Sequence, residues 1–556
     1  MEDGARSGLA SNCPRWYAYA ESVLHLSERT LGLRCNGRGP SKWASDRSRA
    51  ANCGTYSTPG FIIEAVMAEL GRLLPSSRAP LSILDQSLEA GHFAFGAMAR
   101  LHRHRVRFFG VDRDPIAIAM ARRLFNGFRQ FSDSARFFFR ATVGDSLFGE
   151  LPRGWPQQFN CVVGNPPWKG TDRQVMAPVW NRYSPPLKGQ FDAYLAFILR
   201  AHERVMPGGL ISLVVPSSLL SNLSAEPIRR LLLEEYDMLS LIVFPRRSFI
   251  ELPCVVPICF TARKRCGPEH SANCKTRVLY HPIRLGGVKR PRSDVSVSIV
   301  QRWQRSPGCV FHPLMGQRTE FLLQKFDMPD LSSFGVFGGG KFRRAAGKAL
   351  VTPLTGFRAR DVRAFHACRR EAESFAKGCR QFERPPMTSD ILRSKVVFKN
   401  VRCVTIAARL AAASLGPGEF GVGSCSVFLP TDPAQTGFFV GLLNSSFANA
   451  WYKSRDLCRA IKFWHLRNLP VQFNPASWRR ISHAAKRCSQ IWKSIHDLQD
   501  SCREGDEDQR LKRVCPQQYK ELTDVRHEID HMIFELFGFS PRQRRAICKL
   551  SDSRVF

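Results

Sequence analysis

The chain has 556 residues, more than one ordinary hydrophobic core accommodates, so we expect two to four domains. With 44% hydrophobic and 23% charged residues, the composition is typical of globular proteins and excludes a disordered or fibrous class. Lys and Arg number 82 against 47 Asp and Glu, a formal net charge of +35, which indicates a polyanionic partner, nucleic acid before membrane. The alternative is a generally basic, arginine-rich proteome, because net charge does not report on fold.

The cysteines and the N-terminus narrow the class further. None of the 18 cysteines forms a C-x-x-C pair, and no histidines lie at zinc-site spacing near them, so we expect reduced thiols and no metal site. The first residues lack a signal-peptide pattern, and no window approaches eighteen uninterrupted apolar residues. These features predict a soluble cytoplasmic protein without a membrane partner.

From about Gly54 to Lys264, apolar runs alternate with helical patterns, which predicts βαβ units around a parallel sheet. A helix is expected to begin with Thr58 as N-cap and Pro59 as its first residue. Short strands are expected at 81–85, 107–112, 159–164 and 210–215, with further strands near Leu241 and Val255. A helix lies between the first two strands, and another, stopped by Pro207, should bury Phe191, Leu195, Ile198 and Val205.

The rest of the chain divides into three regions. Periodicity is poor over 266–349, which we interpret as a connecting extension. Residues 350–473 are rich in short β runs and turns, as in a second, mixed α/β domain. From 474 to 556 helical patterns dominate and end in an apolar stripe, interpreted as a core face, that contains Leu522, Val525, Ile529, Ile533 and Leu536.

Three acidic residues follow predicted strands. Asp85 and Asp112 come at the carboxyl ends of two strands, where an acid is placed to accept hydrogen bonds from a ribose. Asp145 in "VGDSL" is placed to accept from an adenine amino group. For any one of these acids alone, a helix cap or turn is the favoured alternative.

The stretch "GNPPW" ends the strand at 159–164. Pro166 and Pro167 fix the backbone and remove donors, Asn165 adds a side-chain carbonyl, and Trp168 offers an aromatic ring. Rigid acceptors beside an aromatic ring suit an exocyclic amine, which donates two hydrogen bonds while its ring stacks. A proline-terminated strand with a buried Trp is an equal alternative when the stretch is taken alone.

The order of these stretches along the chain is more informative than any one stretch alone. Together, "GTYSTPGFIIEAVM", "ILDQSLEAGHF", "GVDRDP", "VGDSL", "GNPPW" and "FDAYLAFILRAHERVMPGGLISLVVPSS" resemble the successive motifs of the N6-adenine-specific DNA methyltransferases of restriction–modification systems, in their γ order. Beyond them, "VTPLTGFRARDV" and "GLLNSSFANAWYKS" look like landmarks of the target-recognition domain, and "EIDHMIFELFGFS" is similar to the closing helix of larger members.

The resemblance implies a domain plan. Residues 1–50 would form an N-terminal arm, and residues 51–265 a Rossmann-like class I methyltransferase domain that depends on S-adenosylmethionine. The extension 266–349 would lead to a mixed α/β target-recognition domain at 350–473 and a helical C-terminal tail at 474–556.

The resemblance also implies roles for individual residues. Asn165 and the Pro166 carbonyl would accept hydrogen bonds from the amine of a flipped adenine, with Pro167 fixing the turn and Trp168 stacking the ring. The S-adenosylmethionine site would use Thr55, Tyr56, Thr58, Asp85, Gly91, Asp112 and Asp145. No metal and no covalent enzyme intermediate are required.

Two departures from the family pattern stand out. Glu89 occupies the position where the first glycine of the cofactor loop is expected, and its carboxylate would repel that of the cofactor. The segment 216–230 contains no aromatic residue to form a second wall for the flipped base, so we expect Leu219, Leu220 or Leu223 in that place.

The predicted function is therefore site-specific methylation of adenine N6 in double-stranded DNA, with a separately encoded restriction endonuclease as an open possibility. Two alternatives stay open. An RNA or protein-amide methyltransferase would use the same amine chemistry, although such enzymes usually lack a C-terminal recognition domain. A DNA-binding protein with an inactive methyltransferase fold would retain DNA without binding the cofactor.

Overall fold

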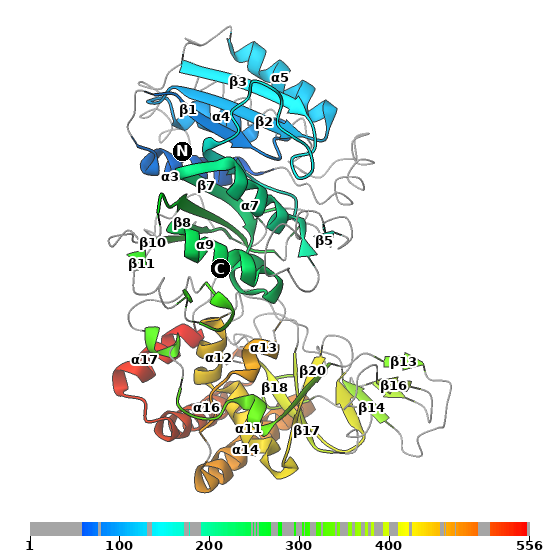
Figure 1. Cartoon of the computed structure of the whole chain (residues 1–556). Coiled ribbons are helices and arrows are strands. Elements are labelled where there is room, and N and C mark those ends of the chain that lie inside the picture. The colour runs from blue at the N-terminus through cyan, green and yellow to red at the C-terminus, as the bar shows by residue number, and fades with distance from the viewer. Residues whose placement is uncertain are drawn as a thin grey trace, which may run out of the picture. The chain divides into compact units, whose positions relative to one another are not determined.

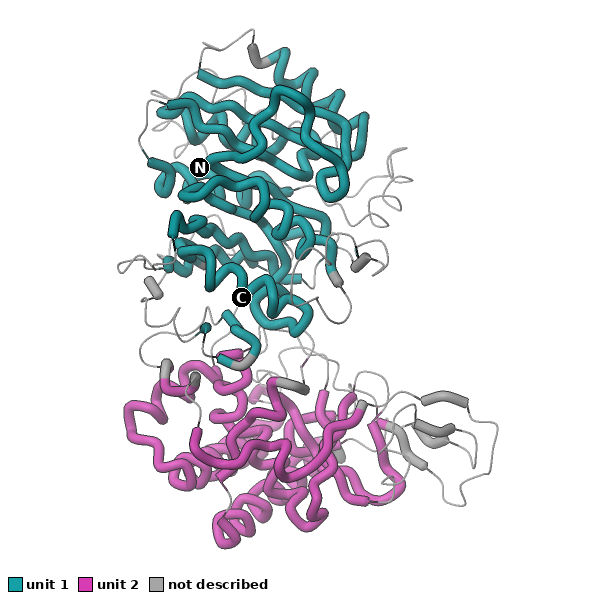
Figure 2. The backbone as a smooth tube through the Cα atoms, in the orientation of Figure 1, with its two compact units in different colours: residues 1–311 teal, residues 312–556 magenta. Residues whose placement is uncertain are grey.

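The chain forms two compact units in a computed structural model, 1–311 and 312–556, and each is described by itself (Figure 2). The boundary falls within the stretch interpreted as a connecting extension. The structure describes the residues 58–75, 79–129, 136–168, 170–171, 177, 191–245, 248–249, 252, 255–267, 276–280, 294–295, 303–304, 306–311, 319–323, 326–339, 342–344, 354–357, 362–367, 373–375, 380–382, 393–399, 410–421, 425–455, 461, 463–472, 474–498 and 512–552.

Unit 1 is built on one nine-stranded sheet with the order β11-β10-β8-β9-β7-β4-β1-β2-β3 (Figure 1). Its pairs are parallel except β7 with β9, β8 with β9, and β10 with β11. The strands are β1 (Leu81–Asp85), β2 (Val106–Asp112), β3 (Phe137–Val143), β4 (Phe159–Gly164), β7 (Val205–Pro216), β8 (Tyr236–Val243), β9 (Pro257–Lys264), β10 (Thr276–Tyr280) and β11 (Asp294–Val295).

The burial of each strand follows its place in the sheet. The central strand β1 is buried along its whole length, which explains its uninterrupted apolar run. The strand β3 at one end of the sheet is exposed at Phe138, Arg140 and Val143. The strands β10 and β11 lie in the region where periodicity is poor, and they extend the other end of the sheet.

The helices of unit 1 follow the strands in βαβ fashion, as predicted. They are α3 (Gly60–Leu73), α4 (His92–Arg100), α5 (Pro115–Arg129), α7 (Ala193–Arg204), α8 (Ser218–Ser221) and α9 (Glu226–Glu235). The short strands β5 (Gly170–Thr171) and β6 (Phe191–Asp192) pair antiparallel with each other. In α3, Ile62, Val66 and Leu70 are fully buried at helical spacing.

Two predicted details of these helices are wrong. The N-cap of α3 is Pro59, so Thr58 lies one residue before the cap, and its hydroxyl makes a tertiary hydrogen bond instead. The helix α7 ends at Arg204, before Pro207, because Val205 enters β7 and pairs with Phe159 of β4. Phe191, expected in that helix, belongs to β6.

Unit 2 combines small sheets with helices. A four-stranded antiparallel sheet has the order β12 (Gly335–Gly339), β20 (Cys425–Pro430), β17 (Lys395–Lys399), β18 (Ala412–Leu415). The smaller sheets contain β13 (Phe342–Arg344), β14 (Leu354–Phe357), β15 (Glu373–Phe375), β16 (Arg380–Phe382) and β19 (Glu419–Gly421). The helices are α11 (Thr436–Asn444), α12 (Ser446–Lys453), α13 (Phe463–Arg467), α14 (Pro475–Leu498), α16 (Pro516–Leu536) and α17 (Pro541–Asp552).

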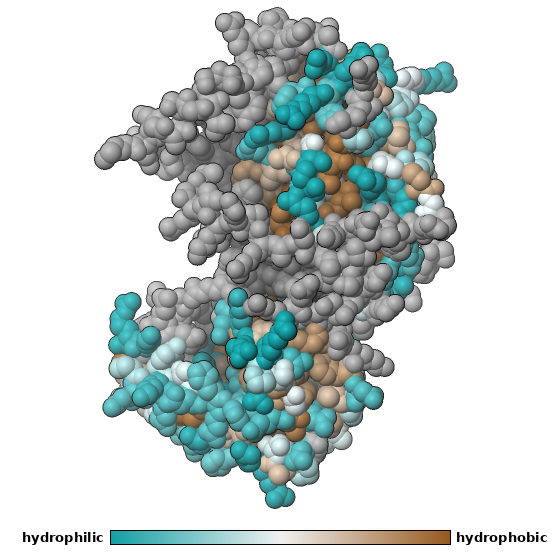
Figure 3. Space-filling model, turned by 90° about the vertical axis from the view of Figure 1, so that its left-hand side faces the viewer, coloured by the Kyte–Doolittle hydropathy of each residue, from teal (hydrophilic) through white to brown (hydrophobic). Residues whose placement is uncertain are grey.

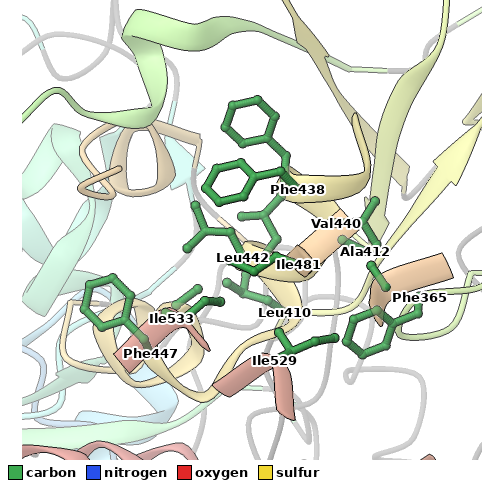
Figure 4. Packing of buried hydrophobic residues seen from close by; sticks show 14 of the residues in the cluster. Phe365, Leu410, Ala412, Phe438, Val440, Leu442, Phe447, Ile481, Ile529 and Ile533 are labelled. Carbon is green, nitrogen blue, oxygen red and sulfur yellow. The ribbon is translucent and has the colours of Figure 1, made fainter. Parts of the chain in front are cut away.

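The core of unit 2 joins its sheet to its helices. Phe438 of α11, Phe447 of α12, Ile481 of α14 and Ile533 of α16 are buried in one cluster (Figure 4). The predicted apolar stripe of α16 faces this cluster, with Leu522, Val525, Ile529 and Ile533 almost fully buried and Leu536 partly buried. Its interpretation as a core face is confirmed.

Candidate active site

The candidate site lies where the strand order of the sheet reverses, between β1 and β4. The strands β2, β1 and β4 are adjacent and parallel, with Asp85 opposite Gly110 and Leu84 opposite Val162. Their carboxyl ends therefore meet at one edge. In open α/β sheets this switch point forms the ligand-binding crevice.

Asp85 is the last residue of β1 and is fully buried. Its Oδ1 accepts from the Ser87 N–H at 2.9 Å, whereas its buried Oδ2 has no hydrogen-bond partner within the described parts of the chain. Burial raises the pKa of Asp85 to about 8, and the nearby Asp112 carboxylate adds to the rise. A buried carboxylate with a free oxygen favours a cationic ligand group, which would restore the ionised form.

Gly164 brings the end of β4 against this carboxylate. A Cβ atom at position 164 would lie 2.6 Å from Asp85 Oδ1, which is closer than any side chain tolerates. The glycine of "GNPPW" is therefore required by close approach to Asp85, and it allows Asn165 to follow directly beside the β1 end.

Asn165 is buried and held at two atoms. Its Nδ2 donates to Thr58 Oγ1 at 3.0 Å, and its main-chain carbonyl accepts from Ser87 Oγ at 3.1 Å. Thr58 is itself 2% exposed, so the first of these hydrogen bonds is shielded from water. Since Ser87 also binds Asp85, a continuous chain of hydrogen bonds runs from Asp85 to Thr58.

Trp168 follows Pro166 and Pro167 and is almost fully buried. Its Nε1 donates to the carbonyl of Val214 in β7 at 3.3 Å. Phe249, between β8 and β9, packs edge-on against the Trp168 ring, with ring centroids 4.8 Å apart and an interplanar angle of 67°. Leu219 and Leu220 are buried, whereas Leu223 is exposed.

The loop after β1 carries Glu89 in a left-handed conformation, with φ of 50°. Its N–H donates to Asp112 Oδ2 at 2.8 Å, and its carboxylate lies 3.6 Å from Nδ1 of His92 in the first turn of α4. Gly91, with φ of 86°, precedes α4 as its N-cap. A left-handed backbone at Glu89 explains why glycine suits this position, since a side chain there is strained.

Asp112 ends β2 and anchors two turns. Its Oδ2 accepts from Glu89 and its Oδ1 accepts from the Asp114 N–H at 2.9 Å. Burial raises the pKa of Asp112, against the lowering effect of these hydrogen bonds. The carboxylate is thus fixed beside the loop and keeps lone pairs for further donors.

Both carboxylate oxygens of Asp145 already have partners within the protein. Its Oδ1 accepts from Leu147 N–H at 2.9 Å and Phe148 N–H at 3.2 Å, and its Oδ2 forms a salt bridge with Arg113. The turn alternative considered for this acid is therefore present. A ligand amine at Asp145 would have to share the carboxylate with Arg113.

The predicted residues thus fall into three groups. Asp85, Asn165 and Thr58 are joined by hydrogen bonds through Ser87, and Asp112 joins the same loop through Glu89. Asp145 pairs with Arg113. Thr55 and Tyr56 lie outside the described residues. Sequence reasoning missed Ser87, Phe249 and Arg113, because the contacts that bring them to the site are tertiary.

The residues present fit S-adenosylmethionine. The unpartnered, fully buried Oδ2 of Asp85 matches an ammonium group, and Asp112 matches ribose hydroxyls. Among the described residues no cluster of three His, Cys, Asp or Glu suits a metal ion. No helix in the described part of the chain is both long and apolar enough to cross a membrane.

Comparisons with known proteins show a family match, a curated relative and similar solved structures. Residues 107–249 match the model of the family described as Eco57I restriction-modification methylase. The Type II methyltransferase M.BanIII of Aneurinibacillus aneurinilyticus is 34% identical over 88 residues, which cover 15% of this chain and only 14% of that protein. The Type IIL restriction–modification enzyme MmeI, solved in complex with DNA, has a TM-score of 0.53 at 10% identity, covering 97% of this chain and 77% of that one. A class I S-adenosylmethionine-dependent methyltransferase from Listeria monocytogenes has a TM-score of 0.36 at 14% identity, covering 48% of this chain and 73% of that one.

The fold of unit 1 is a doubly wound α/β sheet with an antiparallel strand inserted near one side, and the chain shares its fold with the MmeI structure. The predicted resemblance to restriction–modification methyltransferases is confirmed by the family match and the curated relative. Fold and family together imply S-adenosylmethionine as the cofactor.

Proposed function

We propose that this chain is a site-specific DNA methyltransferase that transfers a methyl group to the exocyclic N6 of a flipped adenine. The observation that carries the proposal is the buried Asn165 at the switch point, held by Thr58 and Ser87 and joined through Ser87 to Asp85. This arrangement puts amine acceptors directly beside the residues that fit the cofactor.

The amine chemistry is assigned to the junction 165–168. Asn165 Oδ1 and the Pro166 carbonyl would accept both N–H bonds of the adenine amine, which increases electron density on its nitrogen. Flipping the base out of the duplex costs on the order of a few kcal/mol in unstacking. Trp168 would stack the flipped ring, and Phe249, packed on Trp168, would support that stack in place of the expected leucines.

The cofactor assignment follows the acids. When bound, S-adenosylmethionine supplies an electrophilic methyl group. Asp85 would bind its ammonium group and Asp112 its ribose, while the left-handed Gly91 lets the backbone of the loop approach closely. Thr55 and Tyr56 are assigned to the methionine end, and Asp145 to the adenine, in competition with Arg113. The Thr58 hydroxyl contacts Asn165 instead.

Double-stranded DNA is the proposed partner. The net charge of +35 supports phosphate contacts, and the second unit follows the chain order expected for a target-recognition domain. We assign residues 350–473 to target recognition. Acting on DNA would place the protein in the cytoplasm.

The alternative is a DNA-binding protein with an inactive methyltransferase fold. Glu89 favours it, because its carboxylate stands in the cofactor loop. Its contact with His92 draws that carboxylate toward the first turn of α4 and argues for an active site instead. An RNA or protein-amide substrate would give transfer to RNA or to protein, and not to DNA.

Methyl transfer to mixed-sequence duplex DNA tests the proposal. Labelled S-adenosylmethionine is incubated with wild type, Asn165→Ala and the control Asn126→Ala, an exposed asparagine of α5, and the modified base is identified by mass. We expect N6-methyladenine from wild type and Asn126→Ala, and a rate at least about 100-fold lower from Asn165→Ala. Absence of both transfer and cofactor binding in wild type would favour the inactive fold.

A further inference from the structure

Two hydroxyl groups from earlier parts of the sequence hold Asn165. Thr58 Oγ1 accepts from the side-chain Nδ2 at 3.0 Å, and Ser87 Oγ donates to the main-chain carbonyl at 3.1 Å. Thr58 lies 107 residues before Asn165, and Ser87 lies 78 residues before it. Neither contact is part of a helix, a strand ladder or a cap, so the fold does not need them for its secondary structure.

In the structure, the Asn165 amide directs its NH₂ group at Thr58, whose hydroxyl oxygen accepts that hydrogen bond at 3.0 Å. A side-chain amide can rotate by half a turn and exchange its carbonyl for its NH₂ group. Because the Asn165 NH₂ group binds Thr58, the side-chain carbonyl oxygen Oδ1 points away from Thr58. In the reverse orientation, the NH₂ group would face a substrate amine, donor against donor, and no acceptor would be provided there.

Ser87 couples this amide to the cofactor side of the site. Its N–H donates to Asp85 Oδ1 at 2.9 Å while its hydroxyl binds the Asn165 carbonyl. One residue therefore sets the distance between the carboxylate at the β1 end and the acceptor at the β4 end. Asp85 is fully buried, so the link is rigid and shielded from water.

We propose that Thr58 and Ser87 are positioning residues: Thr58 holds the side chain of Asn165 in place by accepting from its NH₂ group, and Ser87 fixes the Asn165 backbone relative to the cofactor-side carboxylate. The inference rests on the proposed function. It differs from the sequence expectation that Thr58 touches the cofactor, because the hydroxyl is here directed to a residue of the amine-binding junction.

The test compares variants that keep or remove one hydroxyl. Thr58→Val removes the acceptor at nearly constant volume, Thr58→Ser keeps it, and Ser87→Ala removes the second contact. Thr142→Val, on β3, is the matched control, since among the described residues its hydroxyl donates a hydrogen bond only to the neighbouring carbonyl of Val143. Single-turnover methyl transfer to mixed-sequence duplex DNA is measured with full-length protein, and the affinity for S-adenosylmethionine is measured separately by calorimetry.

Thr58→Val is expected to lower the single-turnover rate at saturating S-adenosylmethionine by about 10- to 100-fold, since small misplacement of a reacting group has effects of that size. Its cofactor affinity should stay within about twofold of wild type, which a cofactor contact would not allow. Thr58→Ser should recover most of the rate, and Ser87→Ala should lose about tenfold.

Three results would overturn the inference while leaving the proposed function intact. Thr58→Val could transfer methyl groups as fast as wild type. It could instead weaken cofactor binding and regain the full rate at saturating cofactor, which would assign Thr58 to the cofactor. Thr58→Ser could be as slow as Thr58→Val, which would assign the effect to packing. Failure of wild type to methylate DNA would overturn the proposed function itself, and with it this inference.

Discussion

At the scale of single residues, Arg229 is the most completely buried cation of unit 1. It is fully buried, and its guanidinium donates to the carbonyls of Leu219 and Asn222 at 2.9 and 2.8 Å. It also donates to the carbonyls of Gly308 and Cys309 at 3.1 Å. One side chain therefore joins the loop after β7 to the last residues of unit 1.

Replacing Arg229 with Met should lower the free energy of unfolding by about 3 kcal/mol, because several buried carbonyls would lose their donor. The neighbouring Arg230, which is half exposed and paired with Glu226, is the matched control. Arg230→Met should change the free energy of unfolding by less than about 1 kcal/mol. Urea unfolding of both variants measures the difference. Equal effects would show that the four carbonyl contacts contribute little.

Residue contacts of this kind were beyond sequence reasoning. Asp85, Asp112 and Asn165 could be proposed because each ends an apolar run, and strand ends in a parallel sheet meet at one edge. The contacts of Ser87, Phe249 and the Thr58 hydroxyl could not be predicted, because their partners lie tens of residues away in the sequence. Thr58 resembled an N-cap locally, and a tertiary hydrogen bond determined its role instead.

At the scale of elements, strand pairing overrides local stop signals. The sequence predicted the central strands well, since β1 and β4 are continuous buried runs. The sequence predicted that α7 ends at Pro207. The strand β7 already begins at Val205, because Val205 pairs with Phe159 of β4. The strand β10 pairs with β8 without any alternation that would have identified it.

A buried carboxylate links two helices of unit 2. Asp530 of α16 accepts from the N–H of Ser446 at 2.7 Å and from its hydroxyl at 2.6 Å, at the first turn of α12. Burial raises the pKa of Asp530 to about 6; Asp552 of α17 adds to the rise, while Ser446 and His527 oppose it. The folded chain therefore binds this proton more tightly than the unfolded chain, whose Asp has a pKa near 3.9.

The direction of the pH dependence of stability follows from this difference in pKa. The stability contributed by Asp530 is fully present below about pH 4 and is lost as the pH rises through about 6. Asp530→Asn keeps both contacts, with the amide oxygen accepting from the N–H and the amide NH₂ donating to the hydroxyl. We expect this variant to gain about 2 kcal/mol relative to wild type between pH 4.5 and pH 8.

Urea unfolding at the two pH values measures this gain. Asp524→Asn, on the exposed face of the same helix, is the control and should show no such pH-dependent gain. If Asp530→Asn follows wild type at both pH values, the carboxylate is hydrated in the folded protein and its burial does not govern stability.

At the scale of the whole molecule, the positive charge is spread over both units and is not confined to the matched methylase segment. Figure 3 shows hydrophilic residues over the visible surface of each unit, with apolar residues gathered in one region of unit 1. One helix of unit 2 carries an ordered set of cations. Exposed basic residues recur every seven positions on α14, which puts them on one face: Arg479, Lys486 and Lys493.

Within the described residues, none of these three cations forms a salt bridge with a carboxylate, in contrast to Arg487 of α14, which pairs with Glu528 of α16. Unpaired cations at regular spacing are suited to phosphates, and we expect α14 to contact the DNA backbone. Changing all three to Gln should weaken binding to mixed-sequence duplex DNA without changing base preference. It should also reduce the slope of log affinity against log salt by up to about 3.

The control removes the same charge elsewhere. Lys512, Lys520 and Lys549 are also exposed in unit 2 but lie on other segments, so their triple Gln variant has the same net charge as the α14 variant. Filter binding over a range of salt concentrations compares the two. A smaller slope for the α14 variant alone would assign phosphate contacts to this helix, because a general charge effect would change both variants equally. Equal slopes in both would mean that net charge and not the α14 face drives the association, and the +35 would then be a property of the whole surface.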